Sequence, residues 1–314
     1  MIDVHPRDVL TVAVAGTGHL GQHHVRLAAS NPGVRLLGAY DRDPERLRTV
    51  CSRYGATPLQ DLEAAAQANA VIVATPTVTH REVAGFLLEN GCHVLVEKPI
   101  AATVAEAREL VGLAARYGGT LAVGHVEFHN PAVHAALELA SGVHYLEAQR
   151  LSPFTARSTD VDVILDLMIH DIQITLAVAG EEPSAIRAVG VPVLTDKVDL
   201  CHGWVEFPSG LVANLTASRV SAERVRKLRL FARDSYFSID YAEQTVHSAR
   251  LERGPDGVQI VPQNIEITPE EPLAAEQRAF FAACRGQAAP IVDGRAGAAA
   301  LATAIEIRER TLRR

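Results

Sequence analysis

Over the first 125 residues, short apolar runs alternate with longer segments in which apolar residues recur at helical spacing. Short apolar runs that end in turn residues predict five strands, at 9–16, 34–41, 70–76, 93–99 and 120–125. Between them, apolar residues recur at helical spacing in segments 19–30, 44–55, 79–91 and 103–118. Nearly continuous apolar strands separated by helices predict a doubly wound parallel sheet with helices on both faces.

The pattern changes after residue 125, where strand-like runs follow one another with few helices. Helices are expected at 130–142, around 163–174 and at about 295–312, and strands at 144–151, 185–194, 199–207, 211–220, 225–233 and 236–241. Pro208-Ser209-Gly210 between two of these runs is a hairpin turn signal. We therefore expect α/β domain 1–124, followed by α+β domain 125–314 with a large, mostly antiparallel open sheet. The last helix is expected to pack back on the first domain.

Composition narrows the function classes. The chain has 314 residues, a net charge of -7 and no long basic run, which disfavours nucleic acid or a membrane surface as a partner. No apolar run approaches the length of a membrane-spanning helix. The four cysteines form no CxxC pair, and reduced thiols in a cytoplasmic protein fit best. The run VLTVAV is expected to be a strand and not a signal peptide.

A glycine motif joins the first strand to the first helix. Gly16-Thr17-Gly18-His19-Leu20-Gly21 has the form GxGxxG, and Asp41 follows Gly21 by 20 residues (41 − 21 = 20) at the end of the second strand. Gly16 permits the tight turn, Gly18 admits a pyrophosphate and Gly21 allows close packing of helix and strand. The helix N-terminus stabilises the phosphate charge. The motif predicts a Rossmann domain that binds a dinucleotide.

Asp41 bears on the choice of dinucleotide. A carboxylate at this position accepts hydrogen bonds from the adenosine ribose hydroxyls and repels a 2′-phosphate, which favours NAD. Arg42 follows directly, and an arginine there can hold that phosphate or stack on adenine. NAD is therefore expected, with NADP left open.

The apolar stretch VILDLMIHDIQI, residues 163–174, contains Asp166, His170 and Asp171. Burying such groups is costly unless each has a partner, which either the chain or a ligand must supply. Asp166 and His170 are four residues apart and share one helix face, whereas Asp171 lies on another. We expect Asp171 to be a structural partner of the backbone or of an arginine. A core histidine satisfied by a local carboxylate is the alternative interpretation of the pair.

Five segments together resemble the Gfo/Idh/MocA family of oxidoreductases, which includes glucose-fructose oxidoreductase and inositol dehydrogenase. They are GTGHLG, ATPTVTH (74–80), VEKP (96–99), GHVEFHNPAV (124–133) and DLMIHDI (166–172). The resemblance implies an NAD(P)-dependent dehydrogenase in which the EKP lysine, here Lys98, acts at the nicotinamide. It also makes Asp166 and His170 the second half of the catalytic site.

These assignments imply a hydride-transfer mechanism. In the oxidative direction His170 would take the hydroxyl proton, which suits an imidazole whose unperturbed pKa is about 6.5. Lys98 would stabilise negative charge developing on that oxygen, and Asp166 would orient the lysine or the histidine.

Further site residues are assigned from the motifs themselves and from the resemblance together. Substrate contacts are assigned to His125, Asn130 and Arg157, although a solvated loop arginine is an equal alternative for Arg157. Phe128-His129 stands where relatives commonly carry arginine-phenylalanine, which puts that arginine's substrate contact in doubt. Cofactor contacts are assigned to Gly16, Thr17, Gly18, His19, Leu20, Gly21, Asp41, Arg42, Thr75, Pro76, His80, Glu97 and Lys98.

No metal site is expected at His125, His129 and His134, because Asn130-Pro131 interrupts their spacing and no cysteine joins them. The substrate is expected to be a sugar, preferably a nucleotide sugar such as UDP-N-acetylglucosamine, with inositol or a free hexose as alternatives. A non-catalytic nucleotide sensor on the same fold is the alternative from another class. An open sheet needs its second face covered, so a homodimer or homotetramer through the C-terminal sheet is expected.

Overall fold

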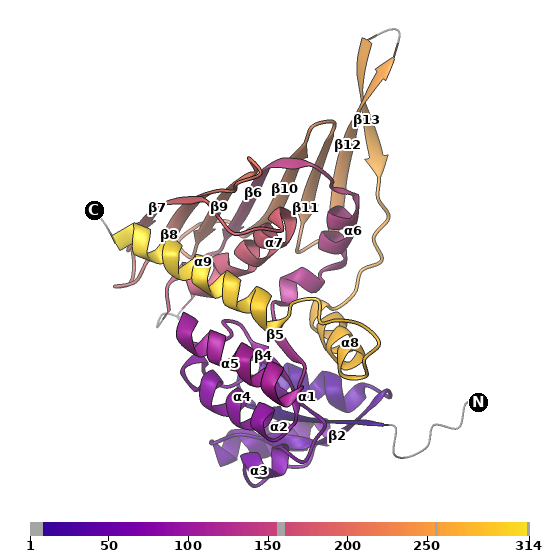
Figure 1. The fold of residues 1–314 in the computed structure, drawn as a ribbon, viewed down its shortest axis with the longest axis vertical. Helices are drawn as coiled ribbons and strands as arrows, with labels where there is room; N and C mark the ends of the chain where they lie inside the picture. Colours follow the sequence, from indigo (N-terminus) through magenta and orange to yellow (C-terminus); the bar gives the residue numbers. More distant parts are fainter. Residues whose placement is uncertain (1–8, 156–160, 255–256, 313–314) are drawn as a thin grey trace, which may run out of the picture. The chain divides into compact units, whose positions relative to one another are not determined.

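The computed structural model describes residues 9–155, 161–254 and 257–312 (Figure 1). Contacts between residues divide the chain into two compact units. The first consists of Met1–His125 with Leu273–Ala298, and the second of Val126–Pro272 with Ala299–Arg314. The expected division after residue 124 did not include a return of segment 273–298 to the first unit.

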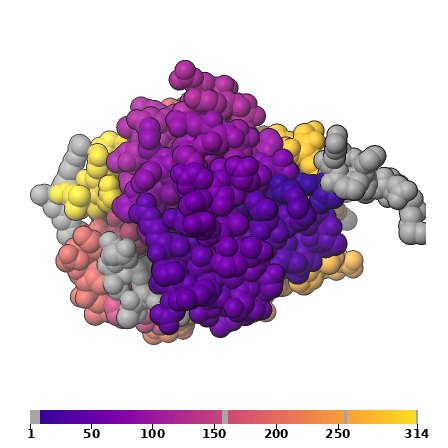
Figure 2. Space-filling model, turned by 90° about the horizontal axis from the view of Figure 1, so that it is seen from below, coloured from indigo at the N-terminus to yellow at the C-terminus, as the bar shows by residue number. Residues whose placement is uncertain are grey.

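The first unit is built on a five-stranded parallel sheet in the order β2-β1-β3-β4-β5. Its strands are β1 (Leu10–Ala15), β2 (Val34–Tyr40), β3 (Ala70–Val73), β4 (His93–Glu97) and β5 (Leu121–Gly124). Its helices are α1 (Gly21–Ser30), α2 (Pro44–Tyr54), α3 (Leu62–Ala65), α4 (His80–Glu89), α5 (Val104–Tyr117) and α8 (Pro272–Cys284), with the 3-10 turn η1 (Thr77–Thr79). Indigo and violet residues of this unit fill the centre of the view in Figure 2.

Local chemistry explains where these helices begin and end. The Asp43 side chain accepts hydrogen bonds from the N–H groups of Glu45 and Arg46 at the start of α2. At α5, Thr103 and Glu106 form the predicted capping box. Helix α2 ends at Gly55, whose φ is 67°. Glycine is favoured at this left-handed C-cap because it has no Cβ.

The second unit contains an eight-stranded sheet in the order β13-β12-β11-β10-β6-β9-β8-β7. All neighbours are antiparallel except β6 and β9, which are parallel, so the predicted fold class is confirmed. The strands are β6 (Val143–Leu151), β7 (Ala185–Val191), β8 (Leu200–Glu206), β9 (Val212–Ser218), β10 (Val225–Ala232), β11 (Ser235–Asp240), β12 (Thr245–Gly254) and β13 (Gly257–Asn264). The 3-10 turn η2 (Val126–His129), helix α6 (Pro131–Leu139), the π-helical turn η3 (Ile164–Met168) and helix α7 (Ile169–Ala179) complete it, and helix α9 (Gly294–Leu312) is shared between the two units.

The sequence pattern did not predict α3, α8, β12 or β13. Helix α8 escapes a periodicity argument because Glu276 and Gln277 are only 1% exposed and interrupt its apolar face. Its Phe280 and Phe281 nevertheless lie in the core cluster around β1 and β3. Strand β13 is mostly exposed and contains Pro262, which is tolerated because β13 is an edge strand.

Within the part of the chain that the structure describes, none of the helices combines the length and the apolar character needed to span a lipid bilayer.

Gly112 on α5 offers a test of this packing. It is exposed, and a Cβ built there meets nothing within 4 Å. We expect Gly112→Ala to stabilise the protein by about 0.8–1 kcal/mol, because alanine has the higher helix propensity. Chemical denaturation measures this directly. As the matched contrast, Gly21→Ala should destabilise, since its Cβ would lie 1.9 Å from the Gly16 carbonyl oxygen. Stabilisation by the Gly21 variant would contradict the described packing.

Candidate active site

The three glycines of the first turn have distinct surroundings. Gly16 has φ of 95°, and a Cβ there would lie 2.5 Å from the carbonyl oxygen of Ala74. A Cβ on Gly21 would lie 1.9 Å from the Gly16 carbonyl oxygen, so α1 can approach β1 this closely only with glycine. At Gly18 a Cβ would meet nothing within 4 Å, which leaves open space beside the backbone for a ligand. This cradle at the start of α1 fits the pyrophosphate of a dinucleotide.

Asp41 follows β2, and the fold holds its carboxylate in one orientation. Its Oδ2 accepts hydrogen bonds from the Thr17 backbone N–H (2.7 Å) and hydroxyl (2.8 Å), and its Oδ1 accepts one from the Asp43 N–H (2.9 Å). Burial acts to raise the pKa of Asp41, but these bonds and the charge of Arg46 outweigh it and lower the pKa. Asp41 is therefore ionised at neutral pH, as discrimination against a 2′-phosphate requires.

A cavity of about 570 Å³ lies at the carboxyl ends of the first three strands. This is the crevice where strand order reverses, because β1 has β2 on one side and β3 on the other. Its lining is Gly16, Gly18, Tyr40, Asp41, Arg42, Arg46, Asp61, Leu62, Glu63, Ala74, Thr75, Pro76, Thr79, Glu82, Val83 and Phe86. Six of the expected cofactor residues line this cavity: Gly16, Gly18, Asp41, Arg42, Thr75 and Pro76.

The other expected cofactor residues of the first turn do not line the cavity. Thr17 is 1% exposed and binds Asp41, whereas His19 is exposed and its ring lies 5.9 Å from that of His23. Leu20 is half-buried and is the N-cap residue of α1.

His80 is enclosed by backbone. It is 1% exposed, with Nδ1 at 2.8 Å from the Pro99 carbonyl oxygen and Nε2 at 2.9 Å from the Thr75 carbonyl oxygen. Burial lowers the pKa of His80, although the two carbonyl groups act in the opposite direction. A neutral imidazole has one N–H and donates to one of these two oxygens, and the ring packs between the segment after β4 and the turn after β3. It thus supports two expected cofactor segments.

Glu97 ends β4 and is directed into the protein. It is 6% exposed, its Oε1 lies 2.8 Å from His24 Nε2, and its Oε2 accepts a hydrogen bond from the Lys98 backbone N–H at 3.2 Å. Gly124 at the end of β5 makes room for it, since a Cβ there would lie 2.8 Å from the Glu97 carboxyl carbon. Glu97 thus anchors the backbone at the half-buried Lys98, at the carboxyl edge of the sheet.

In the second unit, Asp166 and His170 lie where a π-helical turn passes into an α-helix. The Ile169 N–H bonds to the Ile164 carbonyl five residues back, and α7 begins there. Asp166 and His170 are four positions apart. This separation is slightly more than one α-helical turn of 3.6 residues and slightly less than one π-helical turn, so the two side chains remain on one side of the helix. Asp166 is half-buried and His170 is 8% exposed. Single π turns of this kind are frequent at functional sites.

Asp171, on the other side of α7, is held by Arg150 of β6. Arg150 donates to it through Nε (3.0 Å) and Nη2 (2.8 Å), and the Tyr241 hydroxyl donates at 3.0 Å. A third bond runs from Arg150 Nη1 to Glu127 at 2.7 Å. Burial disfavours the charge on Arg150, but Asp171 and Glu127 more than compensate and raise its pKa. The prediction that Asp171 is a structural partner of an arginine is confirmed.

The three expected substrate residues differ in their surroundings. Asn130 caps α6 through a bond from the Ala132 N–H (3.0 Å) and donates to the Tyr241 carbonyl (2.9 Å), so its amide is bound by the protein. His125 is 1% exposed and follows β5 in the first unit. Arg157 lies outside the described residues.

Sequence reasoning missed several residues that shape the two half-sites. Arg46 Nη2 lies 3.4 Å from Asp41 Oδ1, and only the place of Arg46 in the first turn of α2 hints at this contact. The role of Arg150 could not be predicted from nearby sequence, because its partners lie far along the chain. They are Asp171 of α7, Glu127 of η2 and Tyr241 between β11 and β12. A group with metal-ligand geometry among the described residues is His24, Glu97 and Glu276, which is a different set from the histidines considered from sequence.

Comparison with known proteins is consistent with this geometry. Residues 10–125 match the family model described as an oxidoreductase family with an NAD-binding Rossmann fold, and residues 113–237 match the GFO/IDH/MocA C-terminal domain. UDP-N-acetylglucosamine 3-dehydrogenase of Acidithiobacillus ferrooxidans is 38% identical over 305 residues, which are 95% of this chain and 96% of that protein. Its solved structure has a TM-score of 0.90 at 37% identity, covering 96% of this chain and 97% of that one.

More distant relatives share parts of the chain or the fold alone. The scyllo-inositol 2-dehydrogenase (NAD(+)) of Bacillus subtilis is 28% identical over 67% of each chain. Levoglucosan dehydrogenase, solved with NADH and levoglucosan, is 18% identical with a TM-score of 0.85, over 96% of this chain and 97% of that one, which shows a common fold.

Asp41→Asn tests the assignment of the adenosine end. The change keeps the shape of the side chain but removes its charge, so we expect the preference for NADH over NADPH to fall by about tenfold, or about 1.4 kcal/mol. Fluorescence titration of both reduced nucleotides measures the ratio of dissociation constants. Asp43→Asn is the matched control, because Asp43 caps α2 and does not line the cavity. An equal effect in both variants would argue against a specific role for Asp41.

Proposed function

The chain belongs to the Gfo/Idh/MocA family of NAD-binding oxidoreductases, and on that premise we propose that it oxidises the 3-hydroxyl of UDP-N-acetylglucosamine. Its activity class is NAD-dependent dehydrogenation of a sugar alcohol. The observation that carries the substrate assignment is 38% identity over 95% of this chain and 96% of a dehydrogenase of that specificity. The inositol dehydrogenases match at lower identity over smaller parts of the chain, for example 28% over 67%.

Lys98 and His170 are the proposed catalytic pair. Lys98 follows a strand at the carboxyl edge of the first sheet, and His170 follows a π turn in the second unit. In sugar oxidation the His170 imidazole accepts the proton of the substrate hydroxyl as the C–O bond gains double-bond character. The Lys98 ammonium stabilises the negative charge that develops on the same oxygen. NAD, when bound, supplies the acceptor for the hydride that leaves the sugar carbon.

Asp166 has the supporting role in this proposal. It shares a helix face with His170, so its carboxylate can orient the imidazole and stabilise the imidazolium formed by proton transfer. Asp171 is not part of this step, because Arg150 and Tyr241 already bind its carboxylate. The Arg150–Asp171 pair instead fixes α7 against β6, which keeps the His170 backbone in place.

The outer face of the eight-stranded sheet is the proposed contact between copies of this chain. Along β8, Cys201, Gly203 and Val205 are buried while Trp204 is 38% exposed. The Tyr145 ring lies 6.3 Å from that of Trp204 and 5.6 Å from that of Phe231, and Phe231 lies 4.9 Å from Tyr236. Aromatic rows of this kind are enriched in interfaces, which supports a homodimer or homotetramer.

The cytoplasm is the proposed compartment. All four cysteines are free thiols, of which Cys51, Cys92 and Cys201 are buried. Unpaired thiols are typical of a reducing compartment.

Substitution of the catalytic pair tests the mechanism. We expect Lys98→Ala and His170→Ala to lower kcat by about 10²–10⁴-fold, since each removes a group that acts in the transition state. Both variants should still bind NADH, which fluorescence titration checks. Lys227→Ala and His247→Ala, at exposed positions of β10 and β12, are controls that should leave kcat unchanged. Full turnover in the Lys98 or His170 variant would refute the assignment.

The substrate assignment is tested by following NADH absorbance with a panel of alcohols. UDP-N-acetylglucosamine should be oxidised, and free N-acetylglucosamine, inositols and free hexoses should not, because binding energy from the nucleotide part is needed for turnover. Oxidation of inositol alone would replace the proposed substrate. Nucleotide binding without turnover on the whole panel would favour a sensor.

Trp204→Glu tests the proposed interface. A charge placed at the β8 end of the aromatic row should convert the oligomer to a monomer in size-exclusion chromatography with light scattering. Tyr117→Glu is the matched control, since Tyr117 is a 45% exposed aromatic residue on α5 of the first unit. A monomeric wild-type protein, or an oligomer that persists in the Trp204 variant, would exclude this face.

A further inference from the structure

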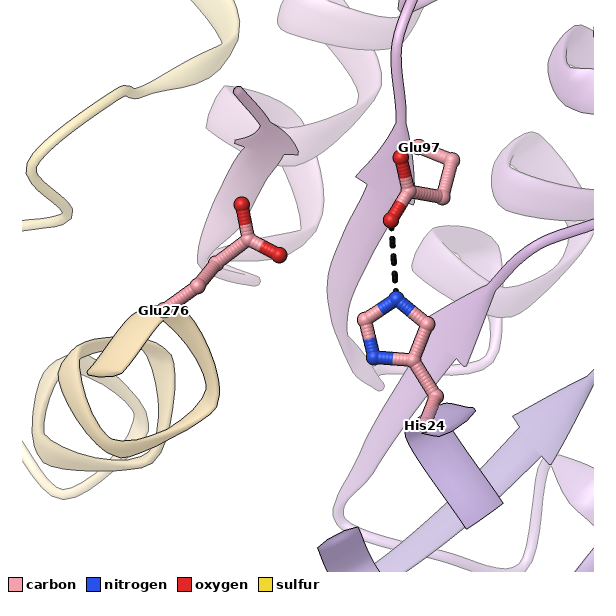
Figure 3. A group of neighbouring side chains, drawn as sticks. All are labelled: His24, Glu97 and Glu276. Carbon is pink, nitrogen blue, oxygen red and sulfur yellow. Dashed lines mark hydrogen bonds and ion pairs between the residues drawn. The ribbon is translucent and has the colours of Figure 1, made fainter. Parts of the chain in front are cut away.

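Three ionisable side chains meet inside the first unit, behind the Glu97-Lys98 segment. His24 comes from α1, Glu97 from β4 and Glu276 from α8, and Figure 3 shows the Glu276 carboxyl group directed toward the other two. One imidazole nitrogen and one oxygen of each carboxyl group all lie within 4.8 Å of one another. The three residues are 0%, 6% and 1% exposed, so solvent does not screen them.

Gln277 determines which nitrogen of His24 carries a proton. Its Nε2 lies 3.0 Å from His24 Nδ1 and 3.1 Å from the His24 carbonyl oxygen. A carbonyl oxygen can only accept, so the amide must present its NH₂ group there, and its second hydrogen points at Nδ1. His24 Nδ1 is therefore an acceptor, and Nε2 donates to Glu97 Oε1 at 2.8 Å.

The two carboxyl groups have unequal support. Glu97 accepts hydrogen bonds from His24 Nε2–H and from the Lys98 backbone N–H. Among the described residues, neither oxygen of Glu276 has a hydrogen-bond partner. Burial and the negative charge of Glu97 raise the pKa of Glu276 well above its usual range. Two carboxylates this close and this buried cannot both be ionised at low cost.

A proton fits this cluster better than a metal ion. A cation bound by all three residues would take the lone pair of His24 Nε2, but that nitrogen already bears the hydrogen directed at Glu97. Keeping the Gln277 bonds and binding a cation through Nε2 would break the His24–Glu97 hydrogen bond. Protonation of Glu276 removes the second negative charge without changing any bond described here.

We propose that Glu276 is a positioning residue that acts as a neutral carboxylic acid. The single proton that it holds leaves one negative charge in the cluster, on Glu97, and Glu97 then fixes the backbone at Lys98. The link to catalysis rests on the proposed role of Lys98. Loss of the proton adds a second negative charge beside Glu97 and disturbs the anchor of that lysine.

The charged and titratable groups around the cluster come from four elements. His24 faces Glu276 from α1, Glu97 faces it from β4, and Lys98 follows Glu97 directly. His80 of α4 is close enough to Glu97 for their charges to interact, and its two ring nitrogens lie 2.8 and 2.9 Å from carbonyl oxygens. Gln277 of α8 is polar but does not titrate. Glu276 is therefore the group whose ionisation would place a second anion in this interior.

The test compares wild type with Glu276→Gln, an isosteric side chain that cannot ionise. Folding raises the pKa of Glu276 above its value in the unfolded chain, which is near 4.5. The contribution of Glu276 to stability is therefore full below pH 4.5 and is lost as the pH rises from there toward the pKa of Glu276 in the folded state. The folding equilibrium constant of wild type should therefore fall relative to that of the glutamine variant, by about tenfold per pH unit in that window. Chemical denaturation between pH 5 and pH 9 measures the ratio without any need for turnover.

Glu89→Gln is the matched control, because Glu89 is exposed at the end of α4, and its ratio to wild type should not change with pH. In steady-state kinetics, Glu276→Gln should also extend the alkaline limit of kcat, an effect that a purely structural side chain would not produce. A pH-independent stability ratio would overturn the proposal, whatever the substrate proves to be. So would a stoichiometric metal in purified wild type that is lost in Glu276→Gln.

If Glu276→Gln fails to fold, infrared spectroscopy of wild type at pH 8 provides the second measurement. The carbonyl band of a protonated carboxylic acid should be present, because the buried acid keeps its proton when exposed carboxyl groups are ionised. Absence of that band would overturn the proposal.

Discussion

The ion pair between Arg150 and Asp171 holds the helix that carries His170. Two parallel N–H···O bonds join β6 to α7, and Glu127 and Tyr241 complete the coordination of both charges. A buried pair with this many bonds is strongly unfavourable to break, because removing either partner leaves an uncompensated charge. The π turn that carries Asp166 lies directly before this anchored helix.

The same constraint takes a different form in the first unit. There the buried anion Glu97 is compensated by N–H donors from His24 and Lys98, with no cationic partner among the hydrogen bonds described. A second carboxyl group, Glu276, is tolerated in the same interior as long as it stays neutral. Both half-sites thus rest on buried carboxyl groups that the chain itself supplies with hydrogen-bond donors, and each supports a segment for which we propose a catalytic role.

Much of the nucleotide half was predictable, because its determinants are local in sequence. Gly16 and Gly21 specify a turn that only glycine can adopt at such close approach, and Asp41 follows at the spacing of one strand–helix–strand unit. The spacing of Asp166 and His170 predicted only that they share a helix face, and their catalytic role stays a prediction from the family resemblance. The bonding of Asn130 and His80 was not predictable, because their partners Tyr241 and Pro99 are set by packing.

The sequence by itself determined the parallel and antiparallel sheets, the glycine turn and the residues that identify the family, because each is encoded by neighbours a few positions apart. Tertiary structure alone decided the return of α8 to the first unit, the Arg150 network and the meeting of His24, Glu97 and Glu276. Those contacts join residues as many as 253 positions apart, as between His24 and Gln277. At such separations no periodicity marks a partner, and burial of α8 against the core brings the groups together.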